Sequence, residues 1–135
     1  MGLSYLLDTN ILSEPTKPQP NPHVLRRLQQ YNGQFCTAVT VWHELHDGVQ
    51  RMVDSKRKTS LFAYLNALEQ GGLVILPYQK TAGEWLAQAR GKLSQQGIAA
   101  PYPDGEIAAI AFSQPLTLVT RNVQDFVMYS QSSIN

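Results

Sequence analysis

The chain has 135 residues, of which 43% are hydrophobic and 16% are charged, and its formal net charge is +1. This length suits one domain with its own core, and the composition is typical of a folded protein rather than a disordered one. No apolar run approaches the roughly 18 residues of a membrane span, so none is predicted. With the single cysteine Cys36 and no signal-like first segment, we expect a cytoplasmic protein.

Four short apolar runs are expected to form strands, with helical patterns between them. The strands are predicted at residues 3–7, 34–38, 73–76 and 116–119. The main helices are predicted at residues 23–31, 41–52, 55–70, 81–96 and 104–111. Thr40 is expected to cap the second of these helices. Because strands that alternate with helices favour a parallel sheet covered on both faces, we predict a single α/β domain over residues 1–135.

Acidic residues lie at the edges of several buried elements. Asp8 ends the first predicted strand, and Asp125 follows the last one closely. Because the loops after parallel strands share one rim of the sheet, these two side chains can meet there. Asp104 opens an almost wholly apolar helix, and Glu44 lies at the border of an apolar helix face. Each acid alone could be a cap or half of an ion pair, but their joint occurrence favours a site.

Four carboxylates in one place repel one another, and a divalent cation is the usual compensation. Hard oxygen ligands suit Mg²⁺, with Mn²⁺ also possible. The expected metal ligands, which are also the expected catalytic residues, are Asp8, Glu44, Asp104 and Asp125. The expected supporting polar residues are Thr9, Thr120 and Asn122. Such a metal would activate a water for in-line attack on a phosphodiester, while basic side chains near the rim would hold the backbone.

Other catalytic motifs fit the sequence poorly. His43, Glu44 and His46 look like part of a zinc helix, but the second histidine would be needed at position 47, where an aspartate stands. A phosphoaspartate phosphatase would need an acid two residues after Asp8, and Asn10 stands there. The sequence has no glycine-rich phosphate loop followed by Lys-Ser/Thr and no Gly-x-Ser-x-Gly motif.

Four segments in register resemble the PIN-domain family, and in particular the VapC-type toxins of prokaryotic type II toxin–antitoxin pairs. The segments are LLDTNILS (6–13), TAVTVWHELHDG (37–48), DGEIAAIA (104–111) and LVTRNVQDF (118–126). They follow the family's order and spacing, and the resemblance covers nearly the whole chain.

This resemblance implies an α/β/α sandwich and a Mg²⁺- or Mn²⁺-dependent endoribonuclease that cleaves RNA. It also implies a homodimer and a small antitoxin protein that masks the site. The same four acids match the family's motif, with Thr120 and Asn122 as supporting residues, and Asp125 stands at the least constant position. Family members usually end in a further short strand, which would here be truncated or reduced to residues 132–135.

Two alternatives stay open at this point. A PIN fold that has lost catalysis could serve as a scaffold for a partner, although a site without chemistry has no need of four repelling carboxylates. A structure-specific DNA nuclease is the other alternative, although those related enzymes tend to carry more acids and added DNA-binding segments. Cleavage of labelled RNA and DNA, with and without Mg²⁺, would separate all three functions.

Overall fold

The described strands form one parallel sheet with β1 (Tyr5–Leu7) inside it. The structure is a computed structural model that describes residues 2–129. β2 (Phe35–Ala38) and β4 (Thr117–Val119) pair with β1 on its two sides, and β3 (Val74–Leu76) pairs with β2. The strand order is β3-β2-β1-β4. Each predicted strand is confirmed: it begins later than expected and ends at the expected residue.

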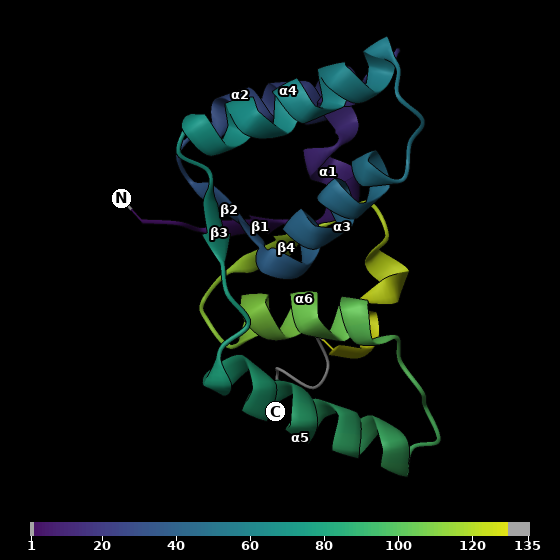
Figure 1. Cartoon of the computed structure of the whole chain (residues 1–135). Coiled ribbons are helices and arrows are strands. Elements are labelled where there is room, and N and C mark those ends of the chain that lie inside the picture. The colour runs from purple at the N-terminus through teal and green to yellow at the C-terminus, as the bar shows by residue number, and fades with distance from the viewer. Residues whose placement is uncertain (1, 130–135) are drawn as a thin grey trace.

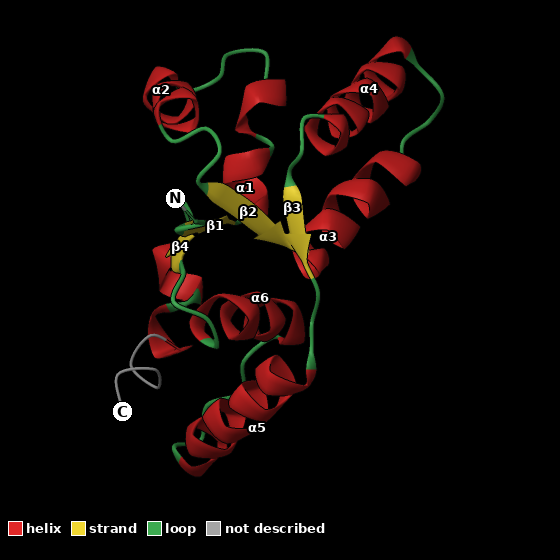
Figure 2. Ribbon diagram, turned by 90° about the vertical axis from the view of Figure 1, so that its left-hand side faces the viewer, coloured by secondary structure: helices red, strands yellow, loops and turns green. Residues whose placement is uncertain are grey.

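Helices cover both faces of this sheet. The short segments are α1 (Thr9–Leu12) and the 3-10 helices η1 (Glu14–Thr16) and η2 (Val123–Asp125). The longer helices are α2 (Pro22–Gln30), α3 (Val39–Gln50), α4 (Lys56–Gln70), α5 (Lys80–Gln95) and α6 (Tyr102–Phe112). Figure 1 shows α2 and α4 above the sheet and α5 and α6 below it, and Figure 2 shows the same layers from the side. The predicted α/β/α sandwich is therefore confirmed.

Helix α6 is buried on nearly all sides, as its apolar sequence predicts. Ala108 and Ile110 are fully buried, and Leu86 and Leu93 of α5 belong to the same core. Burying one such leucine fully contributes roughly 1.5–3 kcal/mol. This packing fixes the first turn of α6, which carries Asp104.

The start of α3 differs from the sequence prediction. The helix begins at Val39, directly after β2, and Ala38 occupies the cap position without a side-chain hydrogen bond. Thr40 therefore lies inside the first turn and is not the cap. Its buried hydroxyl donates to Glu106 Oε1 at 3.1 Å, so it joins α3 to α6.

The expected C-terminal strand and the possibility of a membrane span are considered last. The last strand expected at residues 132–135 lies outside the described residues. Within residues 2–129, no helix is both long enough and apolar enough to cross a membrane.

Gly105 gives a test of how tightly α6 packs. A methyl group added there would lie 2.9 Å from both Leu86 Cδ1 and Tyr129 Oη. Both neighbours are buried, so neither can move aside freely. We expect Gly105→Ala to lower the free energy of unfolding by about 1–3 kcal/mol, the usual cost of overpacking a core.

The matched control is Gly91→Ala in α5. Apart from the backbone of its own helix, no atom of residues 2–129 lies within 4 Å of the methyl group added at Gly91. Alanine stabilises a helix interior by about 0.5–1 kcal/mol relative to glycine. Denaturant unfolding of both variants measures the difference. Equal stability of the two variants would contradict this account of the α5–α6 packing.

Candidate metal centre

Asp8 lies at the junction of β1, α1 and the loop after β4. Its backbone N–H continues the sheet by donating to the Val119 carbonyl at 2.9 Å. Its Oδ1 caps α1 by accepting from the Thr9 N–H at 2.8 Å. Its Oδ2 accepts from Thr120 Oγ1 at 2.7 Å and from Asn10 Nδ2 at 3.4 Å. Asp8 is thus a helix cap and a rim carboxylate at once, so the two interpretations of this residue do not exclude each other.

Glu44 reaches the same rim from α3. Its Oε1 accepts from Thr9 Oγ1 at 2.8 Å, and Thr9 is the residue whose N–H is bound by Asp8. Val41 and Val49 of α3 are buried, whereas Glu44 itself is exposed. The helix therefore anchors one face in the core and presents Glu44 at the water-accessible side of the rim.

Asp104 and Asp125 complete the acidic group. Asp104 is half-buried in the first turn of α6, and Asp125 is exposed in η2. Burial is the largest cause that raises the pKa of Asp104, and three carboxylates raise it further, in the order Asp125, Asp8 and Glu44. The other three predicted acids therefore all act electrostatically on Asp104, which their positions in the sequence only suggested. We call these four residues the acid rim.

The acid rim has little compensation from the rest of the protein. Among residues 2–129, the side chains of Asp104 and Asp125 have no hydrogen bond or ion pair, and Glu44 uses only Oε1. Within the same residues, no three His, Cys, Asp or Glu side chains already form a group that could hold an ion. The four carboxylates are therefore neighbours around a rim rather than a closed coordination shell.

The predicted supporting residues differ in how they contribute. Thr9 and Thr120 donate hydroxyl hydrogen bonds to acids of the rim, as expected. Asn122 contributes its backbone N–H, which donates to Thr120 Oγ1 at 3.0 Å. Within residues 2–129, its carboxamide forms no hydrogen bond with any of the four acids. Sequence reasoning missed Asn10, whose Oδ1 accepts from the Arg121 N–H at 3.0 Å. Its place two residues after the first acid was the available signal.

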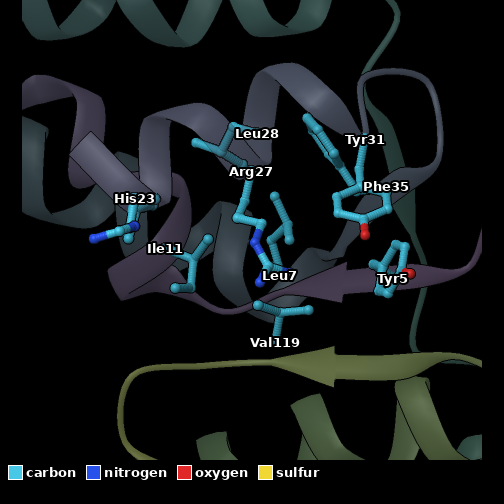
Figure 3. Close-up of a pocket in the computed structure, with 10 residues that line it drawn as sticks. Tyr5, Leu7, Ile11, His23, Arg27, Leu28, Tyr31, Phe35 and Val119 are labelled. Atoms are coloured by element: carbon cyan, nitrogen blue, oxygen red, sulfur yellow. The ribbon is translucent and has the colours of Figure 1, made fainter. Parts of the chain in front are cut away.

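A separate pocket of about 250 Å³ lies between α2 and the sheet (Figure 3). Its lining is mostly apolar and includes Tyr5, Leu7, Ile11, Leu28, Phe35 and Val119. No carboxylate lines it, so it is distinct from the acid rim.

Known proteins are similar to this chain in both sequence and fold, although no family profile matches the sequence. Toxin FitB of Neisseria gonorrhoeae is 36% identical over 128 residues, which cover 90% of this chain and 89% of that protein. Ribonuclease VapC2 of Haemophilus influenzae is 31% identical over 125 residues, which cover 92% of this chain and 90% of that protein.

Solved structures give the same result. The crystal structure of FitAcB from Neisseria gonorrhoeae superposes with a TM-score of 0.80 at 31% identity, over 96% of this chain and 94% of that one. The structure of DNA-bound VapBC from Salmonella typhimurium superposes with a TM-score of 0.77 at 27% identity, over 93% and 91%. Taken with the acids at the ends of the core elements, this similarity over nearly the full length means that the chain belongs to the VapC-type family of PIN-domain toxins.

Proposed function

We propose that this protein is an endoribonuclease toxin of a toxin–antitoxin pair, which hydrolyses RNA phosphodiester bonds with a carboxylate-bound Mg²⁺ or Mn²⁺. The observation that carries the proposal is the acid rim. Burial and the other three carboxylates raise the pKa of Asp104, and none of the four acids is paired with a cation among the described residues. The two relatives, one a toxin and one a ribonuclease by name, support RNA as the substrate.

The residues present fit a divalent cation. Carboxylate oxygens are the hard ligands that Mg²⁺ and Mn²⁺ prefer, and one oxygen of Glu44 and both oxygens of Asp104 accept no hydrogen bond from the described residues. Asp8, Glu44 and Asp104 would hold the ion, with Asp125 bound directly or through water. When bound, the ion would supply a water of lowered pKa and positive charge beside the phosphate.

The protein's own contribution is to orient the carboxylates. The Thr120 hydroxyl donates to Asp8 Oδ2, and the Thr9 hydroxyl donates to Glu44 Oε1. These two hydrogen bonds fix where the remaining lone pairs of the carboxylates point. Partners of this kind, one layer behind the ligands, typically change metal affinity or activity by about 10–100-fold when removed. The exposure of Glu44 and Asp125 leaves the rim open to a polymer, which a buried site would not be.

Substrate binding and assembly extend the proposal. Arg57 is the basic residue that lines a pocket of about 240 Å³ together with Glu44, so we propose it as one of the side chains that hold the RNA backbone. We also propose that the chain acts in the cytoplasm as a homodimer and is held inactive by a small antitoxin protein. The FitAcB and VapBC assemblies of related chains support the antitoxin, and the dimer follows from the family resemblance.

The proposal predicts metal-dependent cleavage of RNA. Wild-type protein should cut labelled RNA in Mg²⁺ or Mn²⁺, should not cut it in EDTA, and should leave DNA of the same sequence intact. Asp8→Asn keeps the shape of the side chain but removes its charge, so it should fold and cut nothing. Normal RNA cleavage by folded Asp8→Asn protein would refute the assignment, and cleavage of DNA instead of RNA would favour the DNA nuclease.

A second prediction concerns the charge of Asp104. Because its folded-state pKa is raised, its ionised form opposes folding at neutral pH, and this penalty disappears as the pH falls through that raised pKa. Without metal, Asp104→Asn should therefore melt at a higher temperature than wild type at pH 7, and the gap should shrink at acidic pH. Thermal unfolding between acidic pH and pH 7 measures this gap in melting temperature. A lower melting temperature for the variant than for wild type at pH 7 would contradict the repulsion between the carboxylates.

The metal should reverse this order of stability. An ion at about 100 times its dissociation constant stabilises the folded state by about 2.7 kcal/mol. Mn²⁺ should therefore raise the melting temperature of wild type and have little effect on Asp104→Asn. An equal shift in both proteins would mean that the ion binds elsewhere.

Glu44 gives a third prediction, with a matched control on the same helix. Glu44→Gln keeps the packing of the stem, but an amide is a poor ligand for Mg²⁺. We expect it to fold normally and to lose about 100-fold or more in kcat, or about 2.7 kcal/mol of transition-state stabilisation.

Asp47→Asn makes the same change of charge in α3, but Asp47 is paired with Arg51 at 3.0 Å rather than with the rim. It should cut RNA nearly as fast as wild type, and so should His43→Gln. If either control variant loses as much cleavage rate as Glu44→Gln, the assignment of Glu44 to the acid rim is wrong.

A further inference from the structure

Glu14 is a buried carboxylate outside the acid rim. It lies in η1 and is 2% exposed. Its Oε2 accepts from the Asn21 N–H at 2.9 Å, and its Oε1 lies 3.0 Å from Lys17 Nζ and 2.6 Å from Arg121 Nη1. The Asn21 N–H, followed by Lys17 and Arg121, lowers the pKa of Glu14 against the effect of burial. The side chain is therefore a fixed negative charge at neutral pH.

Arg121 is held at two points. Its guanidinium binds Glu14, and its backbone N–H donates to Asn10 Oδ1 at 3.0 Å. It directly follows Thr120, whose hydroxyl donates to the first acid of the rim. The bond between Glu14 and Arg121 joins residues 107 positions apart, and it ties the segment after β4 to the segment after α1.

The segment that Arg121 anchors carries the rest of the site. The Asn122 N–H donates to Thr120 Oγ1 at 3.0 Å, and the Asp125 N–H donates to the Asn122 carbonyl at 3.0 Å. Residues 120–125 therefore form a continuous chain of hydrogen bonds from Thr120 to Asp125. A shift of Arg121 would be transmitted along this chain to both ends.

The charge of Arg121 matters as much as its position. A guanidinium next to Thr120 is attracted by the four carboxylates of the rim, and pairing with them would neutralise the charge that draws a divalent cation. Among residues 2–129, Arg121 forms no ion pair with any of the four and is bound by Glu14 instead. Glu14 thus holds this cation in an ion pair of its own.

We propose that Glu14 is a positioning residue, which binds Arg121, holds residues 120–125 against α1 and keeps the guanidinium off the acid rim. This inference rests on the proposed function, because the rim it clears is the proposed metal centre. A buried ion pair is often no more stabilising than well-packed apolar residues, and fixing a geometry is its best-attested use. One partner of Glu14, Arg121, stands between Thr120 and Asn122 in the sequence, which fits that use.

Direct Mn²⁺ titration of the metal-free protein tests whether Glu14 keeps the charge of Arg121 away from the acid rim. Glu14→Gln should weaken Mn²⁺ binding by about tenfold or more, in the range typical of residues that orient ligands. Glu14→Gln combined with Arg121→Gln should bind Mn²⁺ more tightly than Glu14→Gln alone, because the freed guanidinium is gone. Lys17→Gln is the matched control: it removes the other cation from the same carboxylate and should change Mn²⁺ binding little. A double variant as weak as the single one would overturn the proposal.

Amide hydrogen exchange of the metal-free protein tests whether Glu14 holds residues 120–125 in place. This test does not depend on the proposed function. In Glu14→Gln, the N–H groups of Arg121, Asn122 and Asp125 should exchange faster than in wild type, while those of Gly71 and Gly72 should not. Unchanged exchange at residues 121–125, or an equal rise everywhere, would overturn the proposal.

Arg121→Lys provides a second test of the Glu14–Arg121 pair if Glu14→Gln does not fold. Arg121→Lys changes a side chain that is 41% exposed, keeps its charge and shortens its reach, so the same three amides should exchange faster. Wild-type protein that binds no Mn²⁺ would refute the metal centre alone, and the exchange data would still decide the role of Glu14.

Discussion

The position of the Asp8 carboxylate is the constraint on which the site depends. One oxygen accepts from the first N–H of α1, and the other accepts from the Thr120 hydroxyl beyond β4. Because β1 lies between β2 and β4, Asp8 leaves the sheet where chain segments from both sides converge. Thr9 then brings in Glu44 from α3. These donors fix the orientation of the Asp8 carboxylate, and the rim is assembled around it.

The distribution of charge explains why the rim is suited to a cation that is not part of the protein. Asp8, Glu44 and Asp125 all act electrostatically on Asp104, and the arginine nearest to the rim in sequence after β4 is bound by Glu14. The protein thus contains enough positive charge to neutralise its acids, as the net charge of +1 shows, but at this rim it is directed elsewhere. Under the proposed function, a divalent ion would relieve this repulsion when it binds.

Much of the fold and the acidic residues of the site could be predicted from the sequence. Strands buried on both faces are continuous apolar runs, which made the strand ends, and therefore Asp8, visible. The almost wholly apolar sequence of α6 likewise marked Asp104 as an acid at the edge of the core. Glu44 was recognisable because its helix neighbours Val41 and Val49 are apolar, and both are buried.

The parts that could not be predicted depend on long-range contacts or on very short elements. Glu14 stands in a proline-rich stretch, and one of its partners, Arg121, is 107 residues away in the sequence. Thr40 has the chemistry of a cap, but α3 begins before it and directs its hydroxyl to Glu106. The segments α1, η1 and η2 are too short to give a periodic pattern. For Glu14 and Thr40, the tertiary partner rather than local preference decides where the side chain lies.

The most direct test of the central claim is to locate the ion. Crystals of the wild-type protein grown with Mn²⁺ can be measured at the manganese absorption edge, where the anomalous signal identifies the metal. The account predicts a peak within coordination distance, about 2.0–2.3 Å, of carboxylate oxygens from Asp8, Glu44 and Asp104. A peak bound by other residues, or an empty rim at a Mn²⁺ concentration that stabilises the protein, would contradict it.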